Sequence, residues 1–264
     1  MRRRVLGMLL IFATACVLLT VLMSRSELLF GPYTLANHAV RAVLMTVLVV
    51  GAVLLVCRLV TRRPIGSLGL PPQRAAGQLG LGVLLWLVPA GVTTAILLAA
   101  GLVTFTPQQP AGDIVIRLLG LIVLVALFEA IPEEVVFRGF LYGGLAEIWP
   151  RWAAAIGQAV LFTAAGAISG AAATPDRVLM FAVFSLTLGC LRVLCGTAWV
   201  TMGFHLAFQT AAQGLIGNEG LRPFGIAGED WLAGVAFVLV PFVVAIAGAV
   251  ALHHRRPALV MTNS

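Results

Sequence analysis

The segment EAIPEEVVFRGFLY, residues 129–142, places three carboxylates and one guanidinium within ten positions of an otherwise apolar chain. In a helix, Glu134 and Arg138 are four residues apart with the acid first, a spacing that favours an ion pair on one stripe. Glu129 and Glu133 form a second stripe. Two carboxylates one turn apart in a poorly hydrated place favour retention of a proton, which suits one of them to act as a general base near neutral pH.

A second set of polar side chains recurs every four residues in an apolar segment, and it consists of Thr201, His205, Gln209 and Gln213. An ionisable residue inside a membrane is a candidate functional residue. The acidic cluster on one helix and this ridge on another could together supply a general base and hydrogen-bond donors for an oxyanion. The simpler alternatives stay open: His and Gln often join helices by hydrogen bonds, and Glu134 with Arg138 could form only an anchoring ion pair.

The composition of the whole chain indicates which solvent surrounds these residues. Of the 264 residues, 61% are hydrophobic and 10% are charged, and the mean hydropathy is +1.05. A typical soluble domain has about a quarter of its residues charged. All 17 basic residues are arginines that lie between apolar runs, so their charge does not indicate a nucleic-acid partner. We therefore expect an all-α, polytopic integral membrane protein whose main partner is the lipid bilayer.

A membrane-spanning helix needs about 20 predominantly apolar residues. Eight segments meet this condition, and the sixth is short: residues 5–23, 42–60, 77–102, 114–131, 153–173, 178–191, 196–217 and 231–252. They suggest three parts in one bundle: residues 1–113 with three spans, a core of residues 114–217 that carries both polar clusters, and residues 218–264 with the last span and a tail.

The distribution of arginines predicts the orientation of the chain. With the N-terminus in the cytoplasm, twelve arginines fall on the inner side and five on the outer side, the latter being Arg25, Arg41, Arg117, Arg177 and Arg222. Cytoplasmic segments carry the excess of Lys and Arg. We therefore expect both termini in the cytoplasm and the protein in the inner or plasma membrane of the cell.

The energetic cost of membrane burial restricts where the acidic cluster can lie. A charged residue at the centre of a spanning helix costs about 2.5–3.5 kcal/mol, so four such residues facing lipid would cost on the order of 10 kcal/mol. The cluster is therefore expected either in the interface or pointing into the bundle. Pro132 removes one backbone hydrogen bond and can kink the helix, which would open room for water.

These motifs resemble the CPBP family of intramembrane endopeptidases, which comprises type II CAAX prenyl endopeptidases and bacterial Abi or bacteriocin-immunity proteins. The first family motif is EExxxR, and EEVVFR at residues 133–138 matches it fully, with Gly139 following. The last family motif is HxxxN or HxxxD after a Gly-rich turn and a Trp. GTAWVTMGFHLAFQ, residues 196–209, supplies this context with His205 in place. The resemblance covers about residues 114–217.

The chain departs from the family pattern at two positions. In the second motif, FxxxH, Phe162 is present but Gly166 stands in the place of the histidine. No histidine lies between His205 and His38, which we expect at a solvated or interfacial position. Gln209 replaces the Asn of the last motif and keeps a carboxamide. Gly166 and Gly170 also form a GxxxG pattern, which is typical of close helix packing.

The resemblance implies a role for each residue of the site. Glu133 would activate the hydrolytic water, Glu134 and Arg138 would orient the water or the substrate, and His205 with Gln209 would stabilise the oxyanion. Glu129, Phe162 and Gly166 are supporting positions. The substrate would be a membrane-associated protein or peptide, cut near the cytoplasmic face.

The resemblance also raises the question of a catalytic zinc ion. A catalytic zinc takes three protein ligands. One histidine with neighbouring carboxylates leaves this set incomplete unless Glu129 joins it, so the sequence assigns no metal.

Two further functions are consistent with the sequence. One is a catalytically inactive relative, a pseudoprotease that binds a membrane peptide and serves in scaffolding or immunity, which the residue Gly166 favours. The other is a small proton-coupled transporter in which intramembrane glutamates relay protons. The absence of paired repeat halves in the sequence disfavours a transporter.

Overall fold

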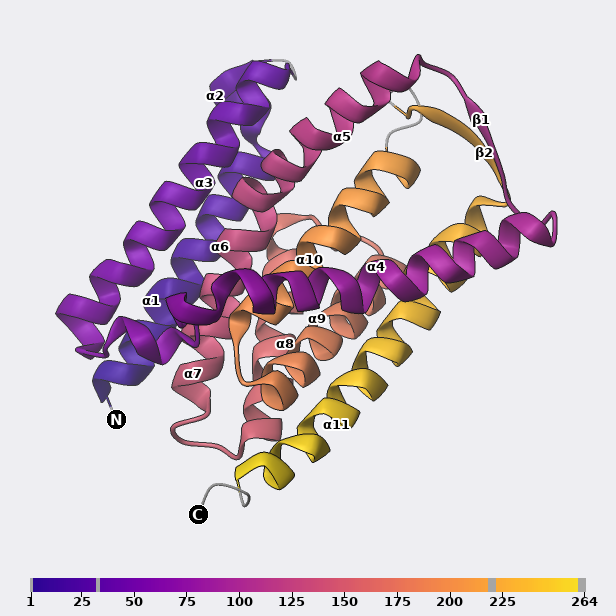
Figure 1. The fold of residues 1–264 in the computed structure, drawn as a ribbon. Helices are drawn as coiled ribbons and strands as arrows, with labels where there is room; N and C mark the ends of the chain where they lie inside the picture. Colours follow the sequence, from indigo (N-terminus) through magenta and orange to yellow (C-terminus); the bar gives the residue numbers. More distant parts are fainter. Residues whose placement is uncertain (1, 32–33, 218–221, 261–264) are drawn as a thin grey trace.

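The computed structural model describes residues 2–31, 34–217 and 222–260 as a bundle of helices with one short β-hairpin (Figure 1). The first part contains α1 Arg2–Leu19, η1 Thr20–Ser24, α2 Ser26–Phe30, α3 Leu35–Val56, η2 Cys57–Thr61, η3 Ile65–Leu68, η4 Pro72–Arg74, α4 Ala75–Ala99 and β1 Thr104–Pro107. The core contains α5 Ala111–Val125, η5 Ala126–Ala130, α6 Ile131–Glu133, η6 Glu134–Leu141, α7 Tyr142–Leu145, α8 Arg151–Ser169, α9 Pro175–Cys195, α10 Ala198–Ala211 and η7 Ala212–Ile216. The last part contains β2 Phe224–Ala227, η9 Trp231–Leu239 and α11 Val240–Val260.

Seven helical runs in the described part of the chain are long and apolar enough to cross a membrane, which confirms the all-α polytopic fold. They are Arg2–Met23, Leu35–Thr61, Pro72–Ala99, Ala111–Leu145, Arg151–Ser169, Pro175–Cys195 and Trp231–His253. The segment expected as a span at 196–217 is also helical, as α10 and η7. It is not among the seven because its polar ridge makes it less apolar than the others.

The fourth helix is longer than predicted. We expected it to end at residue 131, but the helical run continues for 35 residues to Leu145. Such a run is about 50 Å long, which exceeds the roughly 30 Å of a hydrocarbon core. The helix does not stop at the acidic cluster, because Glu134 and Arg138 are buried inside the bundle. The sixth helix is longer as well, Pro175–Cys195, and it begins after the N-cap residue Thr174.

Pro132 lies between two stretches of this fourth helix that have π-type hydrogen bonding, η5 and η6. A proline inside a helix removes a hydrogen bond, and π-type turns are frequent at functional sites. The helix changes direction near α6, between the slanted α5 and the descending α7 (Figure 1). The expected irregularity at Pro132 is therefore present, and it places the acidic cluster at the bend.

The start of α1 and the end of α11 lie at the same end of the bundle (Figure 1). The connection between η2 and α4 closes this end: Thr197 Oγ1 donates to the Gly69 carbonyl oxygen over 3.1 Å, and Trp199 Nε1 donates to that of Pro71 over 3.1 Å. Two arginines assigned to inner loops, Arg138 and Arg192, are instead buried in the bundle. Ten of the twelve arginines assigned to the inner side remain.

The opposite end carries α2 and the hairpin. Strands β1 and β2 pair antiparallel, with Thr104 opposite Ala227 and Pro107 opposite Phe224. The sequence predicted only polar connections here, because each strand is four residues long and lies in a segment with Pro and Gly on either side.

Candidate active site

Glu134, Arg138 and His205 form a buried cluster between η6 and α10. Oε1 of Glu134 accepts hydrogen bonds from Arg138 Nη1 over 3.1 Å and from His205 Nδ1 over 3.0 Å. The side chains of Glu134 and Arg138 are 0% exposed and that of His205 is 1% exposed. A carboxylate oxygen accepts and does not donate, so the imidazole carries a proton on Nδ1.

Further residues contact the guanidinium of Arg138 in addition to Glu134. Nη2 donates to Ser185 Oγ over 2.9 Å, and Ser185 Oγ donates to Gln158 Oε1 over 3.4 Å. The guanidinium carbon also lies 4.6 Å from the ring centroid of Phe162. Ser185 and Gln158 were not among the predicted site residues. Their only signal was their position as polar residues within apolar helices.

Glu133 faces the other edge of the imidazole. Its Oε2 lies 3.9 Å from His205 Nε2, which is too long for a direct hydrogen bond and within reach of one bridging water. Nε2 is buried and has no hydrogen-bond partner among the described residues. The Glu133 side chain is 15% exposed. The two consecutive glutamates therefore differ in environment, because Glu134 is enclosed and Glu133 reaches open space.

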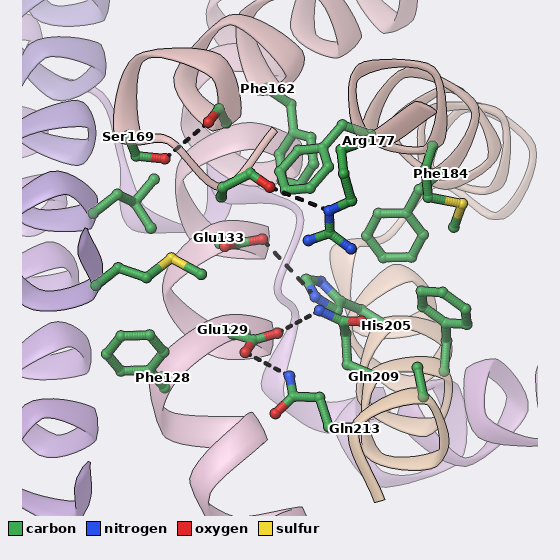
Figure 2. A pocket seen from close by; sticks show the side chains of 18 of the residues that line it. Phe128, Glu129, Glu133, Phe162, Ser169, Arg177, Phe184, His205, Gln209 and Gln213 are labelled. Carbon is green, nitrogen blue, oxygen red and sulfur yellow. Dashed lines mark hydrogen bonds and ion pairs between the residues drawn. The ribbon is translucent and has the colours of Figure 1, made fainter. Parts of the chain in front are cut away.

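Glu133 and His205 line a cavity of about 620 Å³, which Figure 2 shows from close by. This volume is within the range of about 300–1,000 Å³ that is usual for ligand sites. Most of the wall is apolar, and its aromatic residues are Phe128, Phe137, Phe162, Phe181, Phe184, Phe208 and Phe237. Its polar residues are His38, Arg41, Glu129, Glu133, Ser169, Arg177, His205, Gln209 and Gln213. Glu134 and Arg138 are not part of the wall.

The cavity extends toward the end of the bundle that carries α2 and the hairpin. Its wall includes Met23 in η1, Ala171 between α8 and α9, and Gly217 after η7. Its wall includes no residue of the connections 62–74, 146–150 or 196–197, at the end where the termini lie. Cytoplasmic termini and a cleavage site near the cytoplasmic face therefore exclude each other.

Glu129 is held by the polar ridge of α10 and η7. Gln209 Nε2 donates to its Oε2 over 2.5 Å, and Gln213 Nε2 donates to its Oε1 over 2.7 Å. The amide of Gln209 is thus directed at Glu129 and not at the space between Glu133 and His205 (Figure 2). Thr201 Oγ1 donates to the backbone carbonyl oxygen of Ala198 over 2.9 Å. Two residues of the ridge therefore bind Glu129, whereas Thr201 binds its own helix backbone and His205 binds Glu134.

Gly166 and Gly170 do not form one packing face. Gly166 lies in the cavity wall against Phe181, and a Cβ atom at this position would be 2.5 Å from the Phe181 ring. Gly170 ends α8 in the left-handed conformation at φ +82°, which favours glycine. Close packing is thus observed at Gly166, and at Gly170 the left-handed backbone gives a further reason for glycine.

His38 was expected at a solvated or interfacial position, but it lines the cavity. Its ring centroid lies 5.3 Å from that of Phe128, and its Nδ1 is 3.1 Å from Arg41 Nη2. Arg41 and Arg177 were assigned to outer loops, and both line the cavity as well. The sequence did not reveal these residues as part of the site, because hydropathy assigns the end of a helix to a loop and does not show which way its side chains face.

The donor set does not fit a catalytic zinc ion. The residues that the structure describes contain no group of three His, Cys, Asp or Glu side chains placed to hold one metal. Glu133 and His205 Nε2 face one point, but Glu129 is engaged by two carboxamides. Zinc takes three protein ligands in catalytic sites. We therefore assign no step to a metal.

Residues 115–211 match the family model described as Type II CAAX prenyl endopeptidase Rce1-like. No match was found among the curated proteins or among the solved structures. The matched segment includes Glu129, Glu133, Arg138 and His205, and it confirms the resemblance to the CPBP and CAAX endopeptidases. The family is one of endopeptidases, so the match supports peptide-bond hydrolysis as the class of reaction.

Proposed function

We propose that the protein is an intramembrane endopeptidase in which Glu133 activates water for attack on a peptide bond of a membrane-associated protein or peptide. One observation carries the proposal: a carboxylate open to the cavity faces, at 3.9 Å, the unpartnered Nε2 of an imidazole that Glu134 fixes from the other side. A water molecule bound between Glu133 Oε2 and Nε2 would donate one hydrogen bond to each of them.

The reaction follows from this arrangement. Glu133 takes a proton from the water as the oxygen bonds to the carbonyl carbon, which gives a tetrahedral intermediate. The proton then passes from Glu133 to the nitrogen of the leaving amine, the carbon–nitrogen bond breaks, and a carboxylic acid and an amine form. The acid passes its remaining proton to the amine, so that a carboxylate and an ammonium group are released and Glu133 is again a carboxylate. His205 holds the water in place. Glu134 and Arg138 act through His205 and are positioning residues.

The proposed enzyme is expected to be slow. The family motif has a histidine where this chain has Gly166, and Gln209 is engaged with Glu129. Loss of one oxyanion donor typically costs about 10²–10³ in rate. Hydrolysis would thus remain measurable, provided that Glu133 and His205 act together.

The test compares the wild type with Glu133→Gln on a panel of membrane proteins and peptides, with new chain ends identified by mass spectrometry. Removal of a general base lowers the rate by about 10²–10⁴, so products should form with the wild type and nearly vanish with Glu133→Gln. Glu27→Gln is the matched control, because Glu27 is an exposed acid of α2 outside the cavity wall. Equal products from the wild type and Glu133→Gln would contradict the proposal.

A second candidate function is a pseudoprotease that binds a membrane peptide without cutting it. Gly166 favours this alternative, because it removes a polar group of the family motif and packs against Phe181. Binding of peptides in the cavity without any new chain end from the wild type would support it over hydrolysis.

A further inference from the structure

Arg177 places a guanidinium in the aromatic part of the cavity wall. It lies in the first turn of α9, where its backbone N–H donates to Thr174 Oγ1 over 3.4 Å. Its Nε donates to the Ala171 carbonyl oxygen over 3.2 Å, and its guanidinium carbon lies 5.5 Å from the ring centroid of Phe181. These contacts direct the end of the side chain into the cavity, between Phe162 and Phe184 (Figure 2).

The two terminal nitrogens of Arg177 donate to none of the residues whose placement is described. The acids of the wall have other partners: Glu129 accepts from Gln209 and Gln213, and Glu133 faces His205. The planar guanidinium presents paired N–H groups whose spacing matches a carboxylate. The terminal N–H groups of Arg177 are therefore available to a ligand in the cavity that Glu133 and His205 also line.

We infer that Arg177 determines specificity by binding a carboxylate of the peptide substrate close to the bond that is cut. The inference rests on the proposed function, because it takes the occupant of the cavity to be a peptide. The carboxylate would belong to an acidic side chain or to a free chain end. The phenyl rings around Arg177 favour apolar residues on either side of it, because an apolar wall offers no partner to other polar groups.

Arg41, the second arginine of the cavity wall, is a poorer candidate for binding the carboxylate. Arg41 is buried, and its guanidinium is engaged by the Leu22 carbonyl oxygen over 3.3 Å and by His38 Nδ1 over 3.1 Å. Arg177 is exposed, and among the described residues its guanidinium donates a hydrogen bond only through Nε, while its plane contacts the ring of Phe181. The carboxylate is therefore assigned to Arg177.

A purely electrostatic role for Arg177 makes a different prediction. If Arg177 only balanced the charges of Glu129 and Glu133, its removal would change the binding of acidic and neutral peptides by the same factor. If Arg177 binds a carboxylate, its removal weakens the binding of the acidic peptide and leaves the binding of the neutral peptide unchanged.

Binding is measured with mixtures of apolar pentapeptides that carry an uncharged fluorophore without a carboxylate. The protein is the Glu133→Gln variant in nanodiscs, so that the peptides stay intact. One pair of mixtures differs in a free or amidated chain end, and a second, amidated pair differs in a central Glu or Gln. We expect the carboxylate member of one pair to bind about 10–100 times more tightly, as for hydrogen bonds to charged groups. The pair that shows this ratio identifies the source of the carboxylate.

Variants at Arg177 then test the assignment. Arg177→Gln should reduce the affinity ratio of the two peptides to about one, because only the binding of the carboxylate peptide is weakened. Arg177→Lys should keep part of the ratio, because the charge is kept. Arg117→Gln is the matched control, since Arg117 is an exposed arginine of α5 outside the cavity wall, and it should leave the ratio unchanged. Equal weakening of both members, a ratio of one in the parent protein, or no binding of any peptide would overturn the inference.

The outcome separates this inference from the proposed function. Selective binding of the carboxylate peptides, combined with no cleavage by the wild type, would retain the role of Arg177 and remove hydrolysis. Cleavage by the wild type without any carboxylate preference would do the reverse.

Discussion

The two consecutive glutamates of the EExxxR motif face different parts of the site. Consecutive residues on a helix point about 100° apart, so Glu134 can face the imidazole from the enclosed side while Glu133 reaches the cavity. A buried ion pair depends on further hydrogen bonds to its polar atoms. His205 and Ser185 supply two of them, and the ring of Phe162 contacts the guanidinium. Among the described residues, Glu134 Oε2 and Arg138 Nε have no hydrogen-bond partner. The motif thus fixes one edge of the imidazole and leaves the other free.

The histidine missing from the second motif is not expected to be restored by a single substitution. In Gly166→His, the new Cβ atom would meet the ring of Phe181 at 2.5 Å, and a wall residue in close contact cannot give way without cost. We expect Gly166→His to lower the thermal stability in detergent by the equivalent of about 1–3 kcal/mol and to leave hydrolysis no faster.

The double variant Gly166→His with Phe181→Ala removes this contact. It should recover stability relative to Gly166→His, as measured by fluorescence-detected thermal unfolding. Phe181→Ala alone is the control for the lost aromatic contact. A stable, more active Gly166→His protein would show that the wall at this position is more adaptable than its packing indicates.

At the residue scale, the sequence predicted which residues meet but not how they face. The spacing of Glu133, Glu134 and His205 was sufficient to place them in one site. It could not show that Gln209 turns to Glu129, because this depends on the π-type turns of η5 and η7. It also could not show that Arg177 points inward, because a polar helix start after a proline resembles a loop in hydropathy.

At the element scale, α10 is held in place by its close crossing with α4. A Cβ atom on Gly203 would lie 2.0 Å from the Leu79 carbonyl oxygen, and one on Gly82 would lie 2.0 Å from that of Val200. The two backbones therefore touch, as small residues permit in membrane helices. Because Gly203 is two residues before His205, this crossing sets the position of the imidazole.

Gly203→Ala should separate α4 from α10 and displace His205. We expect a loss of about 1–3 kcal/mol or more of stability and a fall in hydrolysis beyond what the lost stability explains. The matched control is Gly80→Ala on α4, where a new Cβ would meet nothing within 4 Å. This control should be neutral or slightly stabilising, because alanine favours helix over glycine by about 1 kcal/mol. An unaffected Gly203→Ala protein would show that α10 does not depend on this contact.

The bounds of the membrane spans were predictable where apolar residues are continuous. They were less predictable where polar residues of a helix face the interior of the bundle. Hydropathy ended the fourth span at residue 131, because Glu133 and Glu134 are polar, yet the helix continues since both are accommodated inside the bundle. It also identified the segment 196–217 despite its polar ridge. The hairpin of β1 and β2 had no signal, because its pairing joins segments more than 100 residues apart.

At the scale of the whole molecule, the cavity and the termini occupy opposite ends of the bundle. After the buried Arg138 and Arg192 are left out, ten arginines remain on the inner side. They still exceed the four that remain at the cavity end, where Arg41 is also buried. The connection that includes Gly69 and Pro71 closes the end where the termini lie. Cytoplasmic termini then place the cavity mouth on the outer face, and the substrate would be an extracytoplasmic segment.

Labelling of single cysteines tests this orientation. In a background where Cys16, Cys57, Cys190 and Cys195 are replaced by alanine, Ala171→Cys puts a thiol at the cavity mouth and Gln73→Cys puts one at the end of the termini. A membrane-impermeant maleimide applied to spheroplasts should label Ala171→Cys at once and Gln73→Cys only after lysis. The reverse pattern would place the cavity in the cytoplasm with the termini outside. In that case the arginine asymmetry would not have set the orientation, and the expectation of cleavage near the cytoplasmic face would stand.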